Sequence, residues 1–195
     1  QVAKGKYVLF LDADMELTPD VIKEAVKKIQ EPLLRQGYGG QARTKNQELK
    51  ALIIPEKSIG SGFWTKCKIL ERMCYEGIDW MEAARFYDKK TFTALGGFDE
   101  TLTGPEDFDL SQRVCLKFGK SSIGRIKSYI HHNEGSIHLM GLLLKKYYYG
   151  KKMTRYSGKK QNTESFVKQA NPLLRYVLFF RKPRLLLLDP VHAIG

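Results

Sequence analysis

The chain has 195 residues, of which 43% are hydrophobic and 28% charged, so it can bury a core and has the composition of a globular protein. Its three cysteines form no Cys-x-x-Cys pair, which argues against a disulfide framework or a structural zinc site and favours a reducing compartment. Residues 1–110 carry 16 Lys and Arg against 18 Asp and Glu, a net charge of −2, whereas residues 111–195 carry 17 against 3, a net charge of +14. The basic excess of the second part suggests an anionic partner: nucleic acid, a membrane surface or a phosphorylated substrate.

The first part of the chain alternates patterns that predict strands and helices. The apolar run 7–11 is typical of a strand buried on both faces. Thr18-Pro19-Asp20 predicts a helix with Thr18 as N-cap and Pro19 in the first helical position, and apolar spacing continues this helix through Gln30. Further along we expect a turn at 37–40, a buried strand at 49–54 closed by Pro55, and a helix at 62–75.

The second part continues the alternation. We expect a strand at 81–87, a short helix at 89–95 ending at Gly96-Gly97, a helix from Pro105 to Gly119, and a strand at 123–130. Ser136 then predicts the N-cap of an apolar-faced helix that reaches Tyr149. Alternating strands and helices indicate an α/β fold, and the chain contains no internal repeat.

Both ends of the sequence suggest a piece of a longer protein. The chain begins at Gln1 without a Met or a targeting segment, and its first predicted strand needs neighbours that nothing upstream supplies. It stops at Gly195, just after an apolar basic stretch. We therefore expect a fragment.

The first acidic motif, Asp12-Ala13-Asp14, directly follows the first predicted strand. Ligands of α/β sheets bind at the carboxyl ends of strands, so both carboxylates should project into the site. Such hard oxygen ligands suit Mg²⁺ or Mn²⁺ carrying a diphosphate. The alternative is a solvated turn in which one Asp caps the next segment.

The second acidic motif combines the turn Gly96-Gly97-Phe98-Asp99-Glu100 with a helix start that contains Glu106, Asp107 and Asp109. A carboxylate in the first turn of a helix is kept ionised by the helix dipole and the free amides. It can then take a proton from an attacking hydroxyl as a general base. The alternative is helix capping, which Asp and Glu do routinely.

The two acidic motifs in this order, with Ala84-Arg85-Phe86-Tyr87 before the Gly-Gly turn, resemble glycosyltransferase family 2 over roughly residues 4 to 150. The resemblance implies a GT-A-like, Rossmann-related sheet flanked by helices, here partial because the opening strands that bind the nucleotide base are absent. It also implies a nucleotide-sugar donor and a divalent cation, Mg²⁺ or Mn²⁺.

The resemblance assigns roles to individual residues. Asp12 and Asp14 match the family's Asp-x-Asp, in which the second aspartate binds the metal and the first lies near the sugar-nucleotide. Asp107 matches the catalytic base, with Glu106 and Asp109 as supporting residues, although Asp109 stays open as the base.

The segment His132-Asn133-Glu134-Gly135 resembles a His-x-Glu-Gly segment of related members, which makes His132 a second candidate metal ligand. A histidine satisfied by backbone at a strand end is the alternative. His131 is the weaker candidate. Trp80 and the stretch 79–85, including Arg85, could form an acceptor-facing wall, or Trp80 could simply pack against the core.

Processive polysaccharide synthases of this family carry a Gln-x-x-Arg-Trp segment after the acidic helix, and this chain has none. We therefore expect an inverting transferase that moves one sugar to a hydroxyl of a glycan or a lipid-linked precursor. We assign residues 1–135 to the catalytic portion and 136–195 to a basic helical extension.

The run from Lys145 to Lys160 holds seven cations and no acid, interleaved with tyrosines. Such a run suits an anionic membrane interface or single-stranded nucleic acid, and a solvated basic face is the plain alternative. The later apolar runs 173–180 and 185–188 are too short to span a bilayer, which takes about 20 residues. An interfacial helix fits better.

We expect a peripheral protein on the cytoplasmic face of the cell membrane. Two other functions stay open: a basic nucleic-acid-binding module, which lacks a recognisable signature and leaves the acidic motifs unexplained, and a catalytically inactive relative that binds sugar-nucleotide. We do not expect nucleic acid to be the partner.

Overall fold

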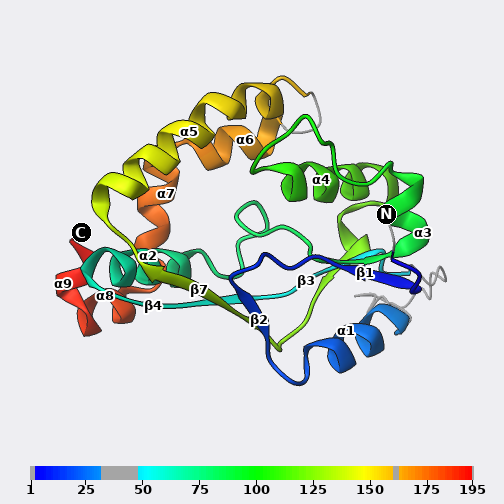
Figure 1. Ribbon diagram of the computed structural model, residues 1–195, viewed down its shortest axis with the longest axis horizontal. Helices are drawn as coiled ribbons and strands as arrows, with labels where there is room; N and C mark the ends of the chain where they lie inside the picture. The colour runs from blue at the N-terminus through cyan, green and yellow to red at the C-terminus, as the bar shows by residue number, and fades with distance from the viewer. Residues whose placement is uncertain (1–2, 32–47, 160–162, 195) are drawn as a thin grey trace, which may run out of the picture.

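The computed structural model describes residues 3–31, 48–159 and 163–194, and its strands form two small sheets with helices on both sides (Figure 1). The turn predicted at 37–40 lies outside the described residues. The larger sheet has the strand order β1-β5-β3-β6. Strand β5 (Phe86–Asp88) runs antiparallel to β1 (Tyr7–Leu9) and β3 (Ala51–Ile53), and β6 (Ile123–Arg125) runs parallel to β3. This mixed α/β architecture agrees with the predicted fold class and with a GT-A-like domain.

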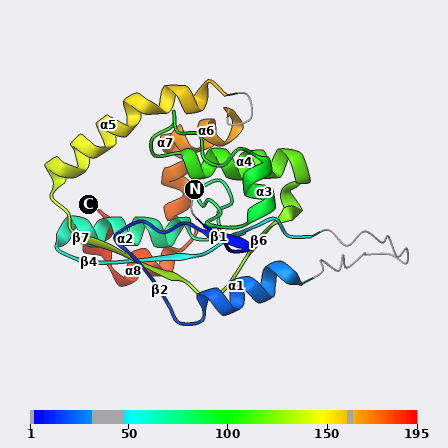
Figure 2. The same cartoon turned by 45° about the vertical axis from the view of Figure 1, so that its right-hand side comes forward.

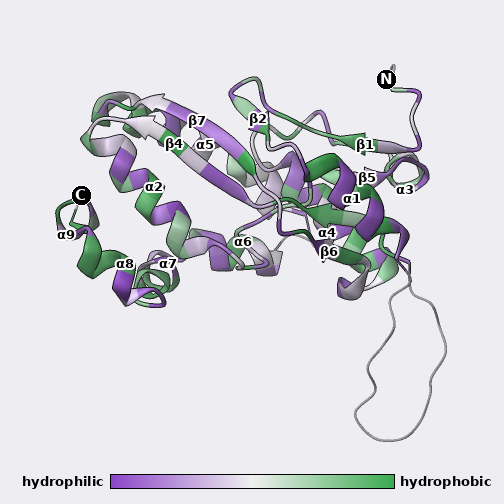
Figure 3. Cartoon of the chain, turned by 90° about the horizontal axis from the view of Figure 1, so that it is seen from below, coloured by the Kyte–Doolittle hydropathy of each residue, from purple (hydrophilic) through white to green (hydrophobic). Residues whose placement is uncertain are grey.

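The smaller sheet has the order β2-β7-β4. Its central strand β7 (Ile130–Ser136) is antiparallel to β2 (Met15–Leu17) and parallel to β4 (Glu56–Ser61). His132 of β7 lies opposite Met15 on one side and Ser58 on the other. Figure 3 shows β7 largely in hydrophilic colours. This sheet therefore aligns the segments that carry the polar motifs.

Helices cover both faces of the larger sheet (Figures 1 and 2). Helix α1 (Val21–Gln30) buries Val21, Ala25 and Ile29 against β3 and β5 on one face. Helix α4 (Glu106–Phe118) buries Leu110 and Val114 on the other, beside α3 (Lys89–Ala94). A 3-10 turn, η1 (Lys120–Ser122), connects α4 to β6. The larger sheet is thus held between two apolar layers.

Several predicted elements are confirmed and several boundaries are wrong. Helix α2 (Phe63–Tyr75), α3 and α4 lie where the sequence predicted helices. Helix α1 begins at Val21 with Asp20 as N-cap, because Thr18 Oγ1 instead donates to the carbonyl of Tyr129 at 2.8 Å. Strand β1 is half-buried because it has a single neighbour, β5, in the described sheet.

The predicted strand 123–130 is also wrong, because it is two strands with a turn between them. The backbone amides of Lys127 and Ser128 donate to the Glu24 carboxylate, both at 2.8 Å, which takes the chain out of the first sheet. Strand β7 then starts at Ile130, and Ser136 ends it opposite Ser61 instead of capping a helix. The predicted strand 81–87 is confined to β5, since Met81 closes a turn on Ile78.

The C-terminal residues form helices that arch from the end of β7 over α4 and return to α2 (Figures 1 and 2). These helices are α5 (Leu139–Ser157), α6 (Thr163–Ala170), α7 (Pro172–Phe179), α8 (Pro183–Leu188) and α9 (Pro190–Ala193). Arg175 of α7 pairs with Glu71 of α2 at 2.7 Å, and the ring of His192 lies 5.3 Å from that of Phe63. The division at residues 135 and 136 stays a prediction. Within the described residues, no helix is both long and apolar enough to span a membrane.

Candidate active site

Asp12 and Asp14 lie between β1 and β2 and project outward, with 62% and 54% of their side chains exposed. The Asp12 carbonyl accepts from the Met15 amide at 3.1 Å, and the Asp14 carbonyl accepts from the Asn133 amide at 2.8 Å. Local turn geometry and the β2–β7 ladder therefore fix both backbones, while both carboxylates stay available to a ligand.

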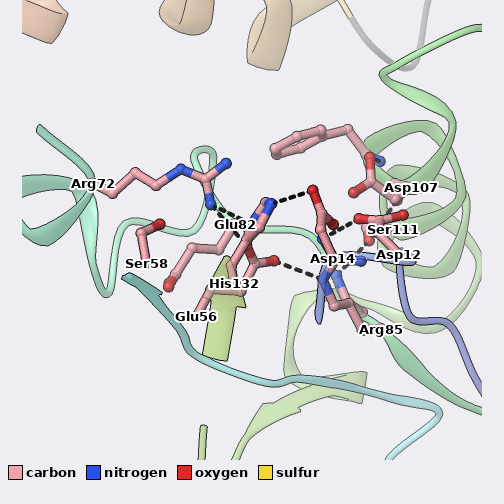
Figure 4. A network of polar contacts seen from close by, with 12 residues as sticks. Asp12, Asp14, Glu56, Ser58, Arg72, Glu82, Arg85, Asp107, Ser111 and His132 are labelled. Atoms are coloured by element: carbon pink, nitrogen blue, oxygen red, sulfur yellow. Dashed lines mark hydrogen bonds and ion pairs between the residues drawn. The ribbon is translucent and has the colours of Figure 1, made fainter. Parts of the chain in front are cut away.

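Arg85 lies directly before β5 and is largely buried. Its Nη2 lies 3.4 Å from Asp12 Oδ2, and its Nε lies 2.6 Å from Glu56 Oε1 (Figure 4). The backbone of Arg85 is fixed as well, since its amide donates to Leu52 and its carbonyl accepts from Phe10, both at 3.0 Å. The guanidinium therefore joins the first acidic motif to β4.

His132 occupies the corresponding place beside Asp14. Its Nε2 lies 3.3 Å from Asp14 Oδ2, and its Nδ1 lies 3.2 Å from Glu56 Oε2. Arg72 Nη1 lies 3.0 Å from the same Nδ1 and 2.9 Å from Glu56 Oε2. His132 is thus within β7 and bonded by side chains, and the alternative of backbone satisfaction at a strand end does not describe it.

Asp107 lies in the first turn of α4, where its Oδ1 accepts from the Phe108 amide at 2.7 Å. Burial raises the pKa of Asp107 to about 6, although the nearby Arg85 charge and the amide bond act in the opposite direction. Ser111 donates to the Asp107 carbonyl at 2.9 Å and also bonds the Ala84 amide at 3.0 Å, which ties the helix start to the segment of Arg85. Asp107 is thus a carboxyl group with a raised pKa that lines a cavity.

Its two acidic neighbours are placed differently. Glu106 accepts from the Gly104 amide at 2.5 Å, as a loop cap does. Asp109 is fully buried and paired with Arg113 at 2.9 Å and Lys159 at 3.1 Å. Lys159 also bonds Asp99 at 2.5 Å, and the pKa of Asp99 lies well below its usual range because of that bond. Asp109 thus fastens the C-terminal helices to α4 and does not line the cavity.

Two cavities flank the Arg85–Glu56–His132 network. One, of about 380 Å³, is lined by Glu56, Arg85 and Asp107 and is bordered by Lys146 of α5. The other, of about 310 Å³, contains Asp14 and is bordered by Lys145 of the same helix. Lys68 borders both. The geometry therefore offers adjoining spaces beside the two acidic motifs.

The stretch 79–85, for which the sequence predicted an acceptor-facing wall, lines the larger cavity only in part, and its role toward an acceptor stays a prediction. Met81, Glu82 and Arg85 line the larger cavity, and Glu82 is held by Arg125 of β6. Trp80 does not line it: its ring packs with Tyr75 and Leu178, and its carbonyl accepts from Gln169 at 2.7 Å. Trp80 thus packs against the core, which was the alternative to a position in the acceptor-facing wall. His131 stacks edge-on against Tyr129.

The sequence reasoning missed Glu56, Arg72 and the role of Glu134. Glu134, almost fully buried, bonds Lys68 at 2.5 Å, Arg72 at 3.2 Å and Ser58 at 3.2 Å. The signal that could have found these residues is polar alternation: Glu56 and Ser58 in β4, and His132 and Glu134 in β7, stand two apart and so share one face of the sheet.

The described residues contain no group of three or more His, Cys, Asp and Glu side chains arranged to hold a metal ion. Asp14 and His132 bring an exposed carboxylate and an imidazole within 3.3 Å of each other, and these two groups could serve as ligands. Two protein ligands fit a Mg²⁺ or Mn²⁺ site completed by water and substrate phosphates, as such ions retain several waters and often bind through one or two carboxylates. Lys68 and Lys145 beside Asp14 suit the charge of those phosphates.

The comparison with known families finds a match in the first part of the chain. The family model described as Glycosyl transferase family 2 matches residues 1–74. Residues 1–74 are therefore similar to part of a family 2 glycosyltransferase domain. No curated protein and no solved structure gives a match.

The family 2 match covers only part of the candidate site. Asp12, Asp14, Glu56 and Arg72 fall within it, whereas Asp107 and the segments around it lie beyond residue 74. The fold nevertheless brings Asp107 and Glu56 to one cavity. For the residues after 74, contacts in the structure are therefore the argument for a shared site.

Proposed function

We propose that this chain carries the catalytic portion of an inverting glycosyltransferase that moves a single sugar from a nucleotide-sugar to an acceptor hydroxyl. The observation that carries the proposal is the position of Asp107. It lines a cavity together with Arg85 and Glu56, its pKa is raised to about 6, and Arg85 contacts Asp12 of the first acidic motif. These contacts support a base and a donor-binding motif that would act at one site.

The chemistry follows from the protonation state of Asp107. A general base works best when its pKa lies near the operating pH, because it is then ionised and still accepts a proton readily. The Asp107 carboxylate takes the proton of the acceptor hydroxyl while the oxygen of that hydroxyl forms a bond to the anomeric carbon of the donor sugar. The bond between that carbon and the phosphate oxygen breaks, and attack from the opposite side inverts the centre.

The donor side belongs to Asp12, Asp14 and His132. Asp14 and His132 would hold Mg²⁺ or Mn²⁺, which when bound neutralises charge on the departing diphosphate. Asp12, which lies 3.4 Å from Arg85, would contact the donor sugar-nucleotide. Lys68 and Lys145 border the cavity of Asp14 and add positive charge for the phosphates.

The test separates binding from transfer in the protein that contains this chain. A panel of nucleotide-sugars is screened by ligand-detected NMR with Mn²⁺, and transfer to glycan and lipid-linked acceptors is followed by mass spectrometry. Asp14→Asn should weaken donor binding, whereas Asp107→Asn should keep it and lose transfer. Transfer retained by Asp107→Asn would refute Asp107 as base. Donor binding without transfer by the wild type would instead identify an inactive relative.

We also propose that the protein docks on an anionic membrane through α5. Exposed apolar side chains recur on this helix at spacings of three and four, and they include Met140 at 66% and Leu144 at 62% exposure. They continue with Leu143, Tyr147 and Tyr148. Lysines flank the stripe, and Lys151 and Lys152 lie over the rings of Tyr147 and Tyr148 at 4.5 and 4.4 Å. Apolar side chains among lysines suit a headgroup region carrying negative charge.

This membrane role is what favours a lipid-linked acceptor and a position at the cytoplasmic face. Flotation with vesicles containing phosphatidylglycerol should carry the protein upward, and neutral phosphatidylcholine vesicles should not. Leu143→Ser with Leu144→Ser should weaken flotation, whereas Leu116→Ser, an equally exposed leucine on α4 at 68%, should not. Equal flotation of all three proteins, or salt-sensitive binding to single-stranded RNA in place of vesicles, would refute membrane docking.

A further inference from the structure

Glu56 is a charged side chain at the start of β4 that the roles above leave unassigned. Its two oxygens have different partners: Oε1 accepts from Arg85 Nε at 2.6 Å, while Oε2 lies 3.2 Å from His132 Nδ1 and 2.9 Å from Arg72 Nη1. About a quarter of the side chain is exposed, 23%. A carboxylate engaged on both oxygens is held in one orientation.

Each of two Glu56 partners contacts one aspartate of the first acidic motif (Figure 4). Arg85 reaches Asp12 Oδ2 at 3.4 Å, and His132 reaches Asp14 Oδ2 at 3.3 Å. Glu56 thus stands at the centre of a chain of contacts whose two ends are the donor-side carboxylates.

We propose that Glu56 is a positioning residue of the transferase site, which holds Arg85 against Asp12 and orients His132 so that Nε2 faces Asp14. The proposal rests on the proposed function for its catalytic meaning, but the geometry it describes belongs to this chain's own residues.

The orientation of His132 follows from what each neighbour can do. A histidine that ligates a metal generally donates its second ring N–H to a carboxylate or a carbonyl, which fixes the tautomer and the ring. His132 Nδ1 lies 3.2 Å from Glu56 Oε2, an acceptor, and 3.0 Å from Arg72 Nη1, a donor that the same Oε2 holds at 2.9 Å. In the tautomer protonated at Nδ1, the bond to Glu56 fixes the ring and leaves Nε2, which faces Asp14, as the nitrogen that would ligate a metal.

Glu56 can act in this way because two guanidinium groups hold its carboxylate, Arg85 at 2.6 Å from Oε1 and Arg72 at 2.9 Å from Oε2. The backbone is equally fixed, since Glu56 lies opposite Ile130 in the β4–β7 ladder and the Ile130 amide donates to Pro55 at 2.9 Å. Its position is set by the same strand that carries His132.

The test uses Glu56→Gln, which keeps the shape, loses the charge and can turn a donor amide toward Nδ1. Mn²⁺ alone is titrated by electron paramagnetic resonance, and the ring ¹⁵N shifts of His132 are read by NMR. We expect Mn²⁺ binding to weaken by about 10- to 100-fold, the usual cost of losing a carboxylate behind a metal ligand. The ¹⁵N shifts should move from the Nδ1–H form, and kcat should fall more than the acceptor KM changes.

The control is Glu164→Gln, since Glu164 is also a carboxylate paired with a cation, Lys168 at 2.7 Å, but lies on α6 and lines neither cavity of the candidate site. It should leave Mn²⁺ binding and the His132 shifts unchanged. If Glu56→Gln fails to fold, Glu56→Asp keeps the charge and is too short to reach both Arg85 and His132, so the shifts should again change.

Unchanged His132 ring shifts in a folded Glu56 variant would overturn the proposal, whatever the activity. The shifts are readable even in a protein that transfers no sugar or binds no Mn²⁺. If the proposed function is wrong, the result differs: the wild type transfers no sugar, but substitution of Glu56 still changes the ring shifts of His132.

Discussion

Replacing Asp107 with Asn should abolish transfer and, at neutral pH, stabilise the fold. Asn has nearly the same shape and keeps an oxygen that can accept from the Phe108 amide, as Asp107 Oδ1 does at 2.7 Å. What it removes is a negative charge that burial makes unfavourable. A residue that merely caps α4 would show no such combination, because losing a capping charge lowers helix stability.

The magnitude follows from the pKa of Asp107, which rises from 3.8 to about 6. A shift of one pKa unit corresponds to about 1.4 kcal/mol, so the upper bound is about 3 kcal/mol. The folded protein binds more protons than the unfolded chain between pH about 4 and about 6, so the wild type loses stability as pH rises through that window. Partial exposure of Asp107 brings the expected gain of Asp107→Asn at pH 7.5 to about 1–3 kcal/mol.

The assay is urea unfolding of both proteins at pH 7.5 and pH 4, without metal or donor. Asp107→Asn should gain stability at pH 7.5 and match the wild type at pH 4. Asp109→Asn is the matched control two residues away, and it should lose about 3–5 kcal/mol because it leaves Arg113 and Lys159 without their buried partner. A destabilised Asp107→Asn at pH 7.5, or one that still transfers sugar, would refute the reasoning.

Three further predictions concern the base and the packing around it. The kcat/KM of the wild type should fall about tenfold per pH unit below pH about 6, where Asp107 becomes protonated, and a profile flat to pH 5 would contradict this. Lys159→Met should cost about 1–3 kcal/mol in unfolding experiments, since the buried Asp109 carboxylate on α4 loses a cation at 3.1 Å, whereas Lys168→Met, whose partner is exposed, should cost less than about 1 kcal/mol. Gly60→Ala should lower the melting temperature, because its Cβ would lie 2.5 Å from a carbonyl oxygen of β7; Gly141→Ala in α5, with open space around it, should be neutral or stabilising by up to about 1 kcal/mol.

Elements defined by local signals could be predicted from the sequence. Helices α2, α3 and α4 have apolar residues at helical spacing and clear ends, such as Gly119 after α4. The strands β1 and β3 are apolar runs, and both were found. These signals depend on neighbours within a few residues, so one sequence contains them.

The polar strands could not be predicted in this way. β4 and β7 carry Glu56, Ser58, His132 and Glu134 where a core strand would carry apolar side chains. Their pairing depends on a turn at 127–128 that Glu24 fixes from about a hundred residues away. Patterns of neighbouring residues contain no information about a contact with a residue so distant in sequence. Residues 123–130 were therefore predicted as one strand.

The residues of the candidate site also fall into those that a local motif predicts and those that depend on the pairing of distant strands. Asp12, Asp14, Asp107 and Arg85 were named from motifs, and the fold links Asp12 to Arg85 and lines one cavity with Arg85 and Asp107. Glu56 belongs to no motif in the sequence. Its significance exists only once β4 and β7 are paired, because that pairing puts its carboxylate beside His132.

The charge asymmetry of the chain also has a structural explanation. Cations on the inner side of the C-terminal helices pair with acids of the first part: Arg175 with Glu71, Lys182 with Glu76, and Lys159 with Asp99. Charge within this group is therefore used to attach the helices to the sheet. The lysines of α5 serve differently, because Lys145 and Lys146 border the cavities of Asp14 and Asp107.

Lys145 and Lys146 of α5 border the cavities of Asp14 and Asp107, so a membrane docked on the exposed stripe of the same helix would lie beside both cavities. An acceptor hydroxyl on a lipid headgroup would then reach the cavities while its lipid stays in the membrane. A water-soluble acceptor would not be brought closer to the cavities by membrane docking. We therefore expect phosphatidylglycerol vesicles to raise the rate of transfer to a lipid-linked acceptor and to leave the rate of transfer to its water-soluble analogue unchanged. Equal stimulation of both rates would show that membrane docking through α5 does not determine the choice of acceptor.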